Sequence, residues 1–538
     1  MKNKYLTFSC GCKFPLGENN SVKFDTDVSS LNMECSKTWD LISEGNTKGC
    51  FQLESRLGQS MSKKLKPSNI EQLSGLISIL RPGCLEAYRD GKSVSNHYID
   101  KKNNLEGIDY FHPSLEDILQ PTYGEMIYQE QAMRITQKIA GFDLKEADML
   151  RKAIGKKKPE EMAKVKKRFI TGCKKQNTVS KEEAEEIFGW IEKSQRYSFN
   201  KSHAISYAMN AYLSAYAKAH FPKIFFASYL KFAKDKIDPQ QEIKELIRNA
   251  SEMDVSVSTP DLRNLNRLFV VGSDDYIFFG LTDIKGVGNS VFDKIIQITE
   301  DGFDASKTSW CYILFRLLLK INSTAVKALI SCGALDYLKI NRTKMLFEYD
   351  VASSLTKKEA AFCETQAMEI DKLKNLLESL LDAPRVNKNR KIKINDAISM
   401  LKNPPYSLQD RIEWLSDSES SLLGAAISCC KLDSYDISMT NTDCKTFKKS
   451  HNKKNIIIAG EISGVNVVKT KKGKNPGQDM AFVTIEDSTG ILDSVIMFPE
   501  TWFQYKHHIF DSNVLVFVGN KTKQSDGFIV EKCFDAHT

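Results

Sequence analysis

Apolar positions recur every three or four residues through most of the region from residue 61 to 260, from SNIEQLSGLISILRPG to IKELIRNASEMDV. This period is that of an amphipathic helix. Ser114 before LEDIL and Ser180 before KEEAEEIFGWIEK are candidate N-caps, because a serine hydroxyl accepts hydrogen bonds from the first free backbone N–H groups of a helix. The pattern therefore predicts a region that is helical almost throughout.

The pattern changes on both sides of this region. Residues 1–60 hold one short β-like alternation, SVKFDTD, and residues 261–445 hold a short strand pair near RLFVVGSDDYIFFGL followed by helices. After a polar gap, residues 453–538 alternate around Gly, Asn and Asp turns. Their five predicted strands are IIIAGEISGVNVVKT, DMAFVTIEDSTG, LDSVIMF, NVLVFVGNKTKQ and GFIVEKCF. We predict an α+β, mostly helical fold that ends in an OB-fold β-barrel.

Composition adds limits to this picture. A chain of 538 residues exceeds what one hydrophobic core usually organises. No apolar run reaches the ~18 residues of a membrane span, and the first residues lack the apolar core of a signal peptide, so we expect a cytoplasmic protein without a membrane partner.

Thirteen scattered cysteines are an odd number, which argues against a disulfide scaffold. Cys10 and Cys12 lack the two-residue spacer of structural zinc pairs. The alternative is that these two converge with Cys35 and Cys50.

The net charge of +8 is concentrated in three basic runs, SKKLKP, GKKKPEEMAKVKKRF and KTKKGKNPG. A single run is usually a solvated helix face, but three runs on separate segments favour a polyanionic partner.

Two segments carry candidate phosphate chemistry. Arg81 stands before a Pro-Gly turn that aims its guanidinium. Asp148, Arg151 and Lys152 are three and four residues apart, so they share one helix face. Arginine and lysine on one rigid face suit a triphosphate, because arginine gives a bidentate fork and lysine a point charge. The alternative is a solvated face with an intrahelical ion pair.

A third segment, YSFNKSHAISYA, crowds aromatic and polar residues before a helix. Tyr197 and Phe199 could stack on a base, Lys201 and His203 could meet phosphate oxygens, and Asn200 could fix the turn. Taken alone, a histidine at a helix start is more often structural.

The order of these segments resembles the C family of bacterial replicative DNA polymerases, typified by the alpha subunit of DNA polymerase III. The matching stretches are VKFD, GCFQLESR, LRPG, HPSLEDIL, PTYGEMIYQEQAMRI, GFDLKEADMLRKAIGKKKPEEM, YSFNKSHAISYA, KAHFP, TPDLRN and FGLTDIKGVG. The resemblance implies a DNA-directed DNA polymerase of DNA replication, with a partial palm (1–60), helical fingers (61–260), a helix-hairpin-helix region (261–445) and the barrel (453–538).

The resemblance also implies residue roles. The family uses three palm aspartates to hold two Mg²⁺ ions, and Lys23 and Asp25 match its Lys-x-Asp strand as phosphate cation and metal ligand. Arg151 and Lys152 match paired cations of the fingers. Tyr197 and His203 match residues beside the incoming deoxynucleoside triphosphate, and Arg81, Asn200 and Lys201 are predicted to bind it with them.

The sequence departs from the family in several places. The Asp-x-Asp strand and the PHP module that precede the Lys-x-Asp strand have no match here, Lys152 replaces a usual Arg, and Cys84 replaces a usual Pro. We expect a partner chain to supply the amino-terminal polymerase half. The alternatives are an inactive truncated relative, a DNA-binding factor without catalysis, or a substitute carboxylate pair formed by Asp25 and Asp27.

Two downstream segments are predicted to bind DNA. Lys285, Gly286 and Gly288 in IKGVGNSVFDKII form a hairpin turn whose amides meet a phosphate of primer-template DNA. In the barrel, Lys469, Lys471, Lys472 and Phe482 are predicted to contact single-stranded DNA. The alternative is a barrel for protein contact, with Phe482 in its core. No stretch convincingly matches the family's sliding-clamp peptide, so clamp binding stays open.

Overall fold

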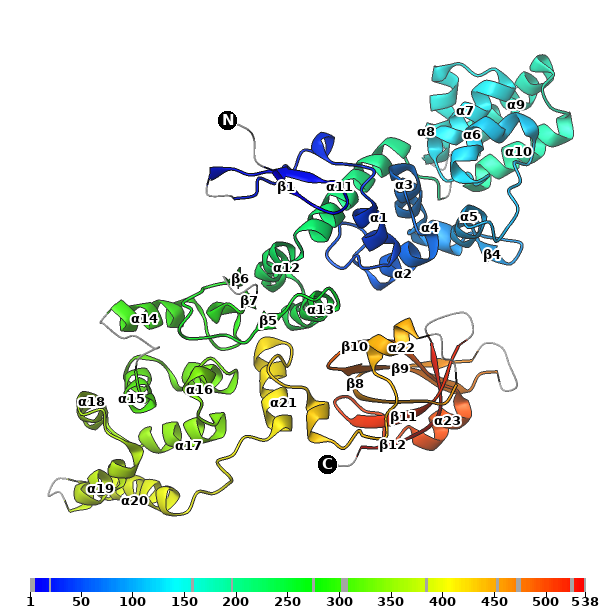
Figure 1. Cartoon of the computed structure of the whole chain (residues 1–538). Helices are drawn as coiled ribbons and strands as arrows, with labels where there is room; N and C mark the ends of the chain where they lie inside the picture. Colours follow the sequence, from blue (N-terminus) through cyan, green and yellow to red (C-terminus); the bar gives the residue numbers. More distant parts are fainter. Residues whose placement is uncertain are drawn as a thin grey trace. The chain divides into compact units, whose positions relative to one another are not determined.

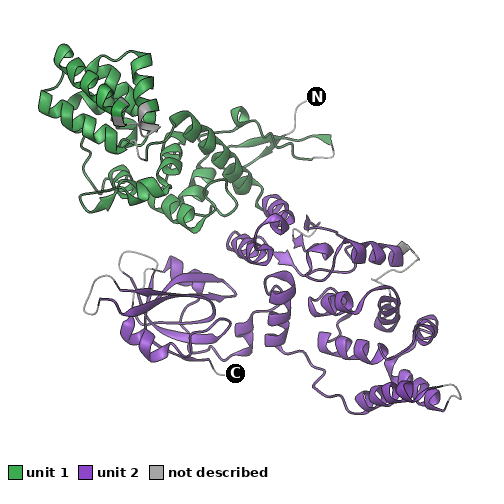
Figure 2. Cartoon of the chain, turned by 180° about the vertical axis from the view of Figure 1, so that it is seen from behind, with its two compact units in different colours: residues 1–222 green, residues 223–538 purple. Residues whose placement is uncertain are grey.

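The computed structural model describes residues 5–18, 21–155, 159–194, 197–272, 276–300, 308–382, 386–450, 454–470, 476–522 and 527–536. The chain divides into two compact units, Met1–Pro222 and Lys223–Thr538, which are coloured separately in Figure 2. No helix among the described residues is long and apolar enough to cross a membrane.

The first unit opens with an antiparallel hairpin of β1 (Tyr5–Thr7) and β2 (Lys13–Pro15), visible in blue in Figure 1. A single bridge between Leu16 and Val22 extends it. The segment that follows is irregular and leads into the 3-10 helix η2 (Val28–Ser30). The prediction that Lys23 and Asp25 lie on a strand was wrong, because the pairing ends at Val22.

Helices form the rest of this unit. They are α1 (Ser36–Ser43), α2 (Arg56–Leu65), α3 (Ile70–Ile79), α4 (Pro82–Glu86), α5 (Val94–Lys102), α6 (Glu116–Leu119), α7 (Gln129–Ala140), α8 (Leu144–Gly155), α9 (Pro159–Gln176), α10 (Lys181–Ser194) and α11 (Lys201–His220). Two-residue strands β3 (Tyr88–Arg89) and β4 (Lys92–Ser93) pair between α4 and α5. Helices α6 to α10 share one apolar core, with Ile135, Phe169 and Phe188 fully or almost fully buried.

Helix α11 runs for 20 residues and packs mainly against α3. Its buried side carries small side chains at a helical period, from Ala204 and Ala208 to Ala215 and Ala219. Small side chains let two helix backbones approach closely, so α11 is held along its length. Both of its ends are therefore fixed relative to the segments around them.

The second unit begins with α12 (Pro222–Lys231) and α13 (Pro239–Glu252) and a small sheet of β5 (Val257–Ser258), β6 (Val270–Val271) and β7 (Ile277–Phe278). Further helices are α14 (Asn289–Glu300), α15 (Trp310–Lys320), α16 (Ser323–Ser331), α17 (Arg342–Ala352), α18 (Lys357–Thr365), α19 (Ile370–Leu381), α20 (Lys388–Lys402), α21 (Ile412–Leu423) and α22 (Cys444–Lys449). Buried Arg342 joins several of them through Asp336 and Glu419, at 2.6 and 2.8 Å.

The last strands close into a five-stranded barrel in the order β8-β9-β10-β12-β11. They are β8 (Ile456–Lys469), β9 (Asp479–Asp487), β10 (Gly490–Met497), β11 (Val514–Lys521) and β12 (Phe528–Asp535), with helix α23 (Pro499–Tyr505) between β10 and β11. Gly519 allows the closure, because a Cβ there would lie 2.0 Å from the Ile529 carbonyl oxygen. The predicted α+β, mostly helical fold with an OB-like barrel is confirmed.

Candidate nucleotide site and nucleic-acid interface

Arg81 is bound to the turn that precedes α11. Its Nη2 donates to the Tyr197 carbonyl at 2.7 Å, and its guanidinium carbon lies 4.0 Å from the centre of the Phe199 ring. The Phe199 N–H donates in turn to the Ile127 carbonyl at 2.8 Å. Three segments that are distant in sequence, LRPG, MIYQEQ and YSFNKSH, therefore meet at this turn.

Asn200 and Lys201 fix the start of α11. The Asn200 side chain accepts from the His203 N–H at 2.9 Å and donates to Glu130 at 2.8 Å, so it is the N-cap. The Lys201 ammonium pairs with Glu71 at 2.7 Å. Both residues already have partners within the protein, and Lys201 must leave Glu71 to meet a phosphate.

Tyr197 and His203 differ in exposure. Tyr197 is half-buried, and burial raises the pKa of its hydroxyl well above the ordinary value, so the hydroxyl stays neutral. His203 is exposed, and its ring lies 4.1 Å from that of Tyr207 and 5.3 Å from that of Phe199. An exposed imidazole on an aromatic platform is well placed to meet a planar or anionic ligand.

Arg151 and Lys152 share one face of α8 with Asp148. Their nitrogens lie 2.8 and 2.7 Å from the Asp148 oxygens, and the two cationic side chains are 40% and 59% exposed. Hydrogen bonds from Lys152 and Arg151 lower the pKa of Asp148. Exposed ion pairs of this kind contribute little to stability, so a triphosphate could take both cations at low cost.

Asp25 and Asp27 sit in consecutive turns. Asp25 Oδ1 accepts from the Asp27 N–H at 2.9 Å, and Asp27 Oδ1 accepts from the Ser29 N–H at 2.9 Å. The second bond caps η2 and lowers the pKa of Asp27. Lys23, Asp25 and Asp27 are all exposed. Within the described residues, neither aspartate belongs to a group of three side chains able to share a metal ion.

The predicted hairpin turn lies before α14. Lys285, Gly286 and Gly288 are exposed, whereas Val287 is buried. Gly286 has φ +93°, a conformation that favours glycine, and a Cβ on Gly288 would meet no atom within 4 Å. The backbone at the start of α14 is thus open to close approach by a phosphate.

The predicted DNA contacts of the barrel that the structure describes, Lys469 and Phe482, lie on two different strands. Lys469 is exposed at the end of β8, opposite Asp479. Phe482 alternates with Ala481 and Val483, which fill the barrel core, so its side chain lies on the outer face. The alternative that places Phe482 in the core is wrong. Lys471 and Lys472 lie outside the described residues.

Two protein-family models match the chain. The bacterial DNA polymerase III alpha subunit finger domain matches residues 16–177, and a helix-hairpin-helix motif matches residues 249–345. DNA polymerase III subunit alpha of Aquifex aeolicus is 32% identical over 497 residues, covering 92% of this chain and 38% of that protein. The Pseudomonas aeruginosa subunit is 30% identical (93% and 42%), and that of Bacillus subtilis 29% (92% and 41%).

The chain is a relative of bacterial DNA polymerase III alpha subunits. It spans about two fifths of the length of the curated relatives it matches. The finger model includes Lys23, Asp25, Arg81 and Arg151, and the helix-hairpin-helix model includes Gly286. The individual roles of these residues, and the domain bounds at 60, 260 and 445, stay predictions.

The sequence prediction missed an aromatic and basic surface beside the barrel of this polymerase relative. Trp502, Phe503 and Lys506, from α23 and the residue after it, line a hollow of about 500 Å³ together with Lys469. Phe503 is 76% exposed, and the Lys506 ammonium lies 5.3 Å from the centre of its ring. Aromatic and basic residues interleave in PETWFQYKHH, and this pattern could have identified the surface.

Proposed function

We propose that the chain is part of a DNA-directed DNA polymerase that adds deoxynucleotides to a primer annealed to template DNA. The observation that carries this proposal is the similarity to DNA polymerase III alpha subunits across 92% or more of the chain. The meeting of LRPG and YSFNKSH at one turn supports it, because residues that would serve one nucleotide lie in both segments.

Metal chemistry would come from two Mg²⁺ ions, which activate the primer hydroxyl and stabilise the transferred phosphate. Asp25 fits as one ligand, since it is exposed and its Oδ2 offers the hard oxygen that Mg²⁺ prefers. One carboxylate is too few for two ions. We propose that the other carboxylates come from outside the 538 residues, in a partner chain, and that Lys23 contacts phosphate beside Asp25.

The fingers residues would bind and orient the nucleotide. Arg151 and Lys152 exchange Asp148 for triphosphate oxygens, and Lys201 leaves Glu71 for the same ligand. His203 and Tyr197 flank the nucleotide, while Arg81 and Asn200 hold the turn that presents them. For Arg151, Lys152 and Lys201, nucleotide binding would replace an ion pair inside the protein with a charge-assisted hydrogen bond to phosphate.

The second unit would hold DNA without reading its sequence. In the exposed turn, Gly286 and Gly288 would offer their backbone amides to a phosphate of the duplex, and Lys285 would offer its side chain, because the Lys285 N–H already donates to the Leu422 carbonyl at 3.0 Å. The barrel offers Lys469 to the backbone of single-stranded template, and Phe482 for stacking on a base.

Primer extension tests the catalytic proposal. The full chain is combined with a candidate partner chain that carries an Asp-x-Asp strand, and extension is compared for Asp25→Asn and Asp27→Asn. Loss of a metal ligand should reduce extension by orders of magnitude. Asp27→Asn is the matched control. It should reduce extension only mildly, because the role of Asp27 is to cap η2 and an asparagine side chain can accept the same hydrogen bond from the Ser29 N–H. Equal activity in wild type and Asp25→Asn would refute the assignment, and equal loss in both variants would favour an Asp25–Asp27 pair.

A DNA-binding factor without catalysis is the second candidate. One observation favours it: the described barrel is closed and exposes Lys469, whereas Asp25 belongs to no described group of metal ligands. Nucleotide binding separates the two functions. Such a factor would bind single-stranded oligonucleotides with a steep salt dependence but would not bind deoxynucleoside triphosphates.

A further inference from the structure

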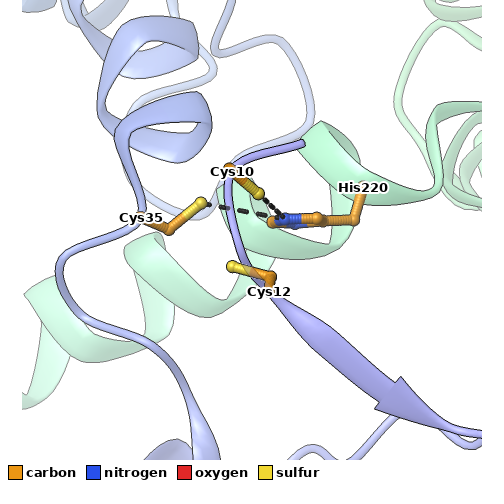
Figure 3. A group of neighbouring side chains, drawn as sticks. All are labelled: Cys10, Cys12, Cys35 and His220. Carbon is orange, nitrogen blue, oxygen red and sulfur yellow. Dashed lines mark hydrogen bonds between the residues drawn. The ribbon is translucent and has the colours of Figure 1, made fainter. Parts of the chain in front are cut away.

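Four potential metal ligands converge in the first unit from three separate segments. Cys10 and Cys12 lie in the turn between β1 and β2, Cys35 is the N-cap residue of α1, and His220 is the last residue of α11. One ligand atom from each lies within 4.8 Å of all the others. Figure 3 shows the three sulfur atoms gathered around one edge of the imidazole ring.

The distances suit one small ion. Cys10 Sγ lies 3.3 Å and Cys35 Sγ 3.7 Å from His220 Nε2. Two ligands of a tetrahedral zinc ion with bonds of about 2.0–2.3 Å are roughly 3.5–3.8 Å apart. The observed spacing therefore requires only small side-chain movements to close around an ion.

The histidine is oriented for this role. Its Nδ1 lies 2.9 Å from the Tyr216 carbonyl, which accepts the ring proton at that nitrogen. The tautomer so fixed leaves the lone pair on Nε2, the nitrogen that faces the sulfurs. A hydrogen bond from the second ring nitrogen to a carbonyl is the usual support of a metal-bound histidine.

The surroundings close the site. Cys12, Cys35 and His220 are buried and Cys10 is partly buried. The rings of Phe8 and Phe14 lie 4.9 and 5.2 Å from the imidazole. Gly11 has φ +83°, a conformation that favours glycine, and it forms the tight turn between Cys10 and Cys12. This turn lets both cysteines face the imidazole. No described cysteine forms a disulfide.

We propose that Cys10, Cys12, Cys35 and His220 bind a structural Zn²⁺ ion. Three thiolates and one imidazole are a complete tetrahedral set for zinc, and four protein ligands leave no position open for catalysis. Soft thiolate ligands disfavour Mg²⁺ and Ca²⁺. The alternative set with Cys50 is wrong, because the group that converges contains His220 in its place.

The site joins the hairpin to the C-terminal end of α11. From the hairpin, Phe14 stacks on Phe24 at 6.1 Å, and Phe24 also lies 5.9 Å from Phe221 at the end of α11. Phe24 stands between Lys23 and Asp25. The ion would therefore hold the segment that carries the candidate catalytic aspartate, a consequence that rests on the proposed function.

Metal analysis of the purified full chain tests the site. We expect one zinc per chain, lost in Cys12→Ser and in His220→Ala but kept in the control Cys50→Ser, which alters a buried cysteine of the same unit. His220→Cys should keep zinc, since a fourth thiolate replaces the imidazole. A zinc content well below one per chain, or one unchanged in Cys12→Ser and His220→Ala, would overturn the proposal.

A second measurement needs no variant. In the native chain, zinc should protect Cys10, Cys12 and Cys35 from alkylation, and a chelator should expose the three together while Cys50 stays protected. A native disulfide between any two of the three would refute the site. Both readouts are independent of polymerase activity, so full zinc without primer extension would refute only the proposed function, and extension without zinc would refute only this site.

Discussion

The two ends of α11 carry different kinds of site. At its N-terminal end, the candidate nucleotide residues from Tyr197 to His203 are neighbours in sequence. At its C-terminal end, His220 meets Cys10 and Cys35, which are 210 and 185 positions away. One helix thus positions both a contiguous motif and a set of ligands that only folding brings together.

The two ends also differ in how their polar groups are satisfied. Asn200 and Lys201 already bind Glu130 and Glu71, so a ligand there must compete with the protein. At the other end, the Cys10 and Cys35 sulfurs lie against His220 Nε2 and the Cys12 sulfur accepts from Asn32, and these weak sulfur contacts would give way to bonds with the proposed ion. We therefore expect large effects at the C-terminal end and graded effects at the N-terminal end.

Zinc removal should have the largest effect. Binding of a structural zinc ion adds to the free energy of folding, and the proposed ion would link the hairpin to α11. Calorimetry of the full chain with and without chelator should show the first unit unfolding at a lower temperature after chelation. Cys12→Ser should already show this lower transition and should not respond to chelator. Identical unfolding curves for native and chelated protein would contradict the expectation that the C-terminal end of α11 depends more strongly on its ligand than the N-terminal end does.

Loss of a fingers cation should weaken nucleotide binding without unfolding the protein. Arg151→Ala or Lys152→Ala removes a charge-assisted contact, which corresponds to roughly tenfold in affinity. The control is Lys181→Ala, which removes an exposed cation from α10 that lies 3.9 Å from Glu185, a longer pair than those of Asp148. Binding of a fluorescent deoxynucleoside triphosphate to each variant measures the change. If Arg151→Ala and Lys152→Ala both bind the nucleotide with the same affinity as Lys181→Ala, then α8 is not part of the nucleotide site.

Release of Lys201 should strengthen nucleotide binding by a smaller factor. Glu71→Gln keeps the size of the side chain but removes the carboxylate that pairs with Lys201 at 2.7 Å. If the protein and the triphosphate compete for this ammonium, affinity should rise by a few-fold, and the gain should vanish in Glu71→Gln/Lys201→Ala. A gain that persists in the double variant would show that Lys201 is not the group involved.

Sequence patterns predicted what is local. The helical period, the barrel strands and the shared face of Asp148, Arg151 and Lys152 all follow from spacing along one element. Asn200 was predicted to fix a turn and does so. The pairing of Lys201 with Glu71 and of Arg81 with the Tyr197 carbonyl depends on tertiary packing, and spacing carries no signal for it.

The same limit explains the errors. Lys23 and Asp25 alternate like strand residues, but a strand also needs a paired neighbour, and the pairing stops at Val22. The cysteine spacing argued against a zinc pair at Cys10 and Cys12, and Cys50 was offered as the fourth member of a cluster, whereas the fourth residue that converges is His220 on a distant helix. A search restricted to cysteine spacing could not have found it.

The N-cap of α11 provides the smallest and most local test. Asn200→Ala should lower the free energy of unfolding by about 1 kcal/mol, the usual effect of losing an N-cap side chain. Asn200→Ser should recover part of it, because the shorter hydroxyl also accepts from the His203 N–H. Zinc content should be equal in wild type and both variants, since the cap lies at the opposite end of the helix. Denaturant unfolding and metal analysis of the same samples would check both expectations. Loss of zinc in Asn200→Ala would show that the N-cap and the zinc site at the two ends of α11 are energetically coupled.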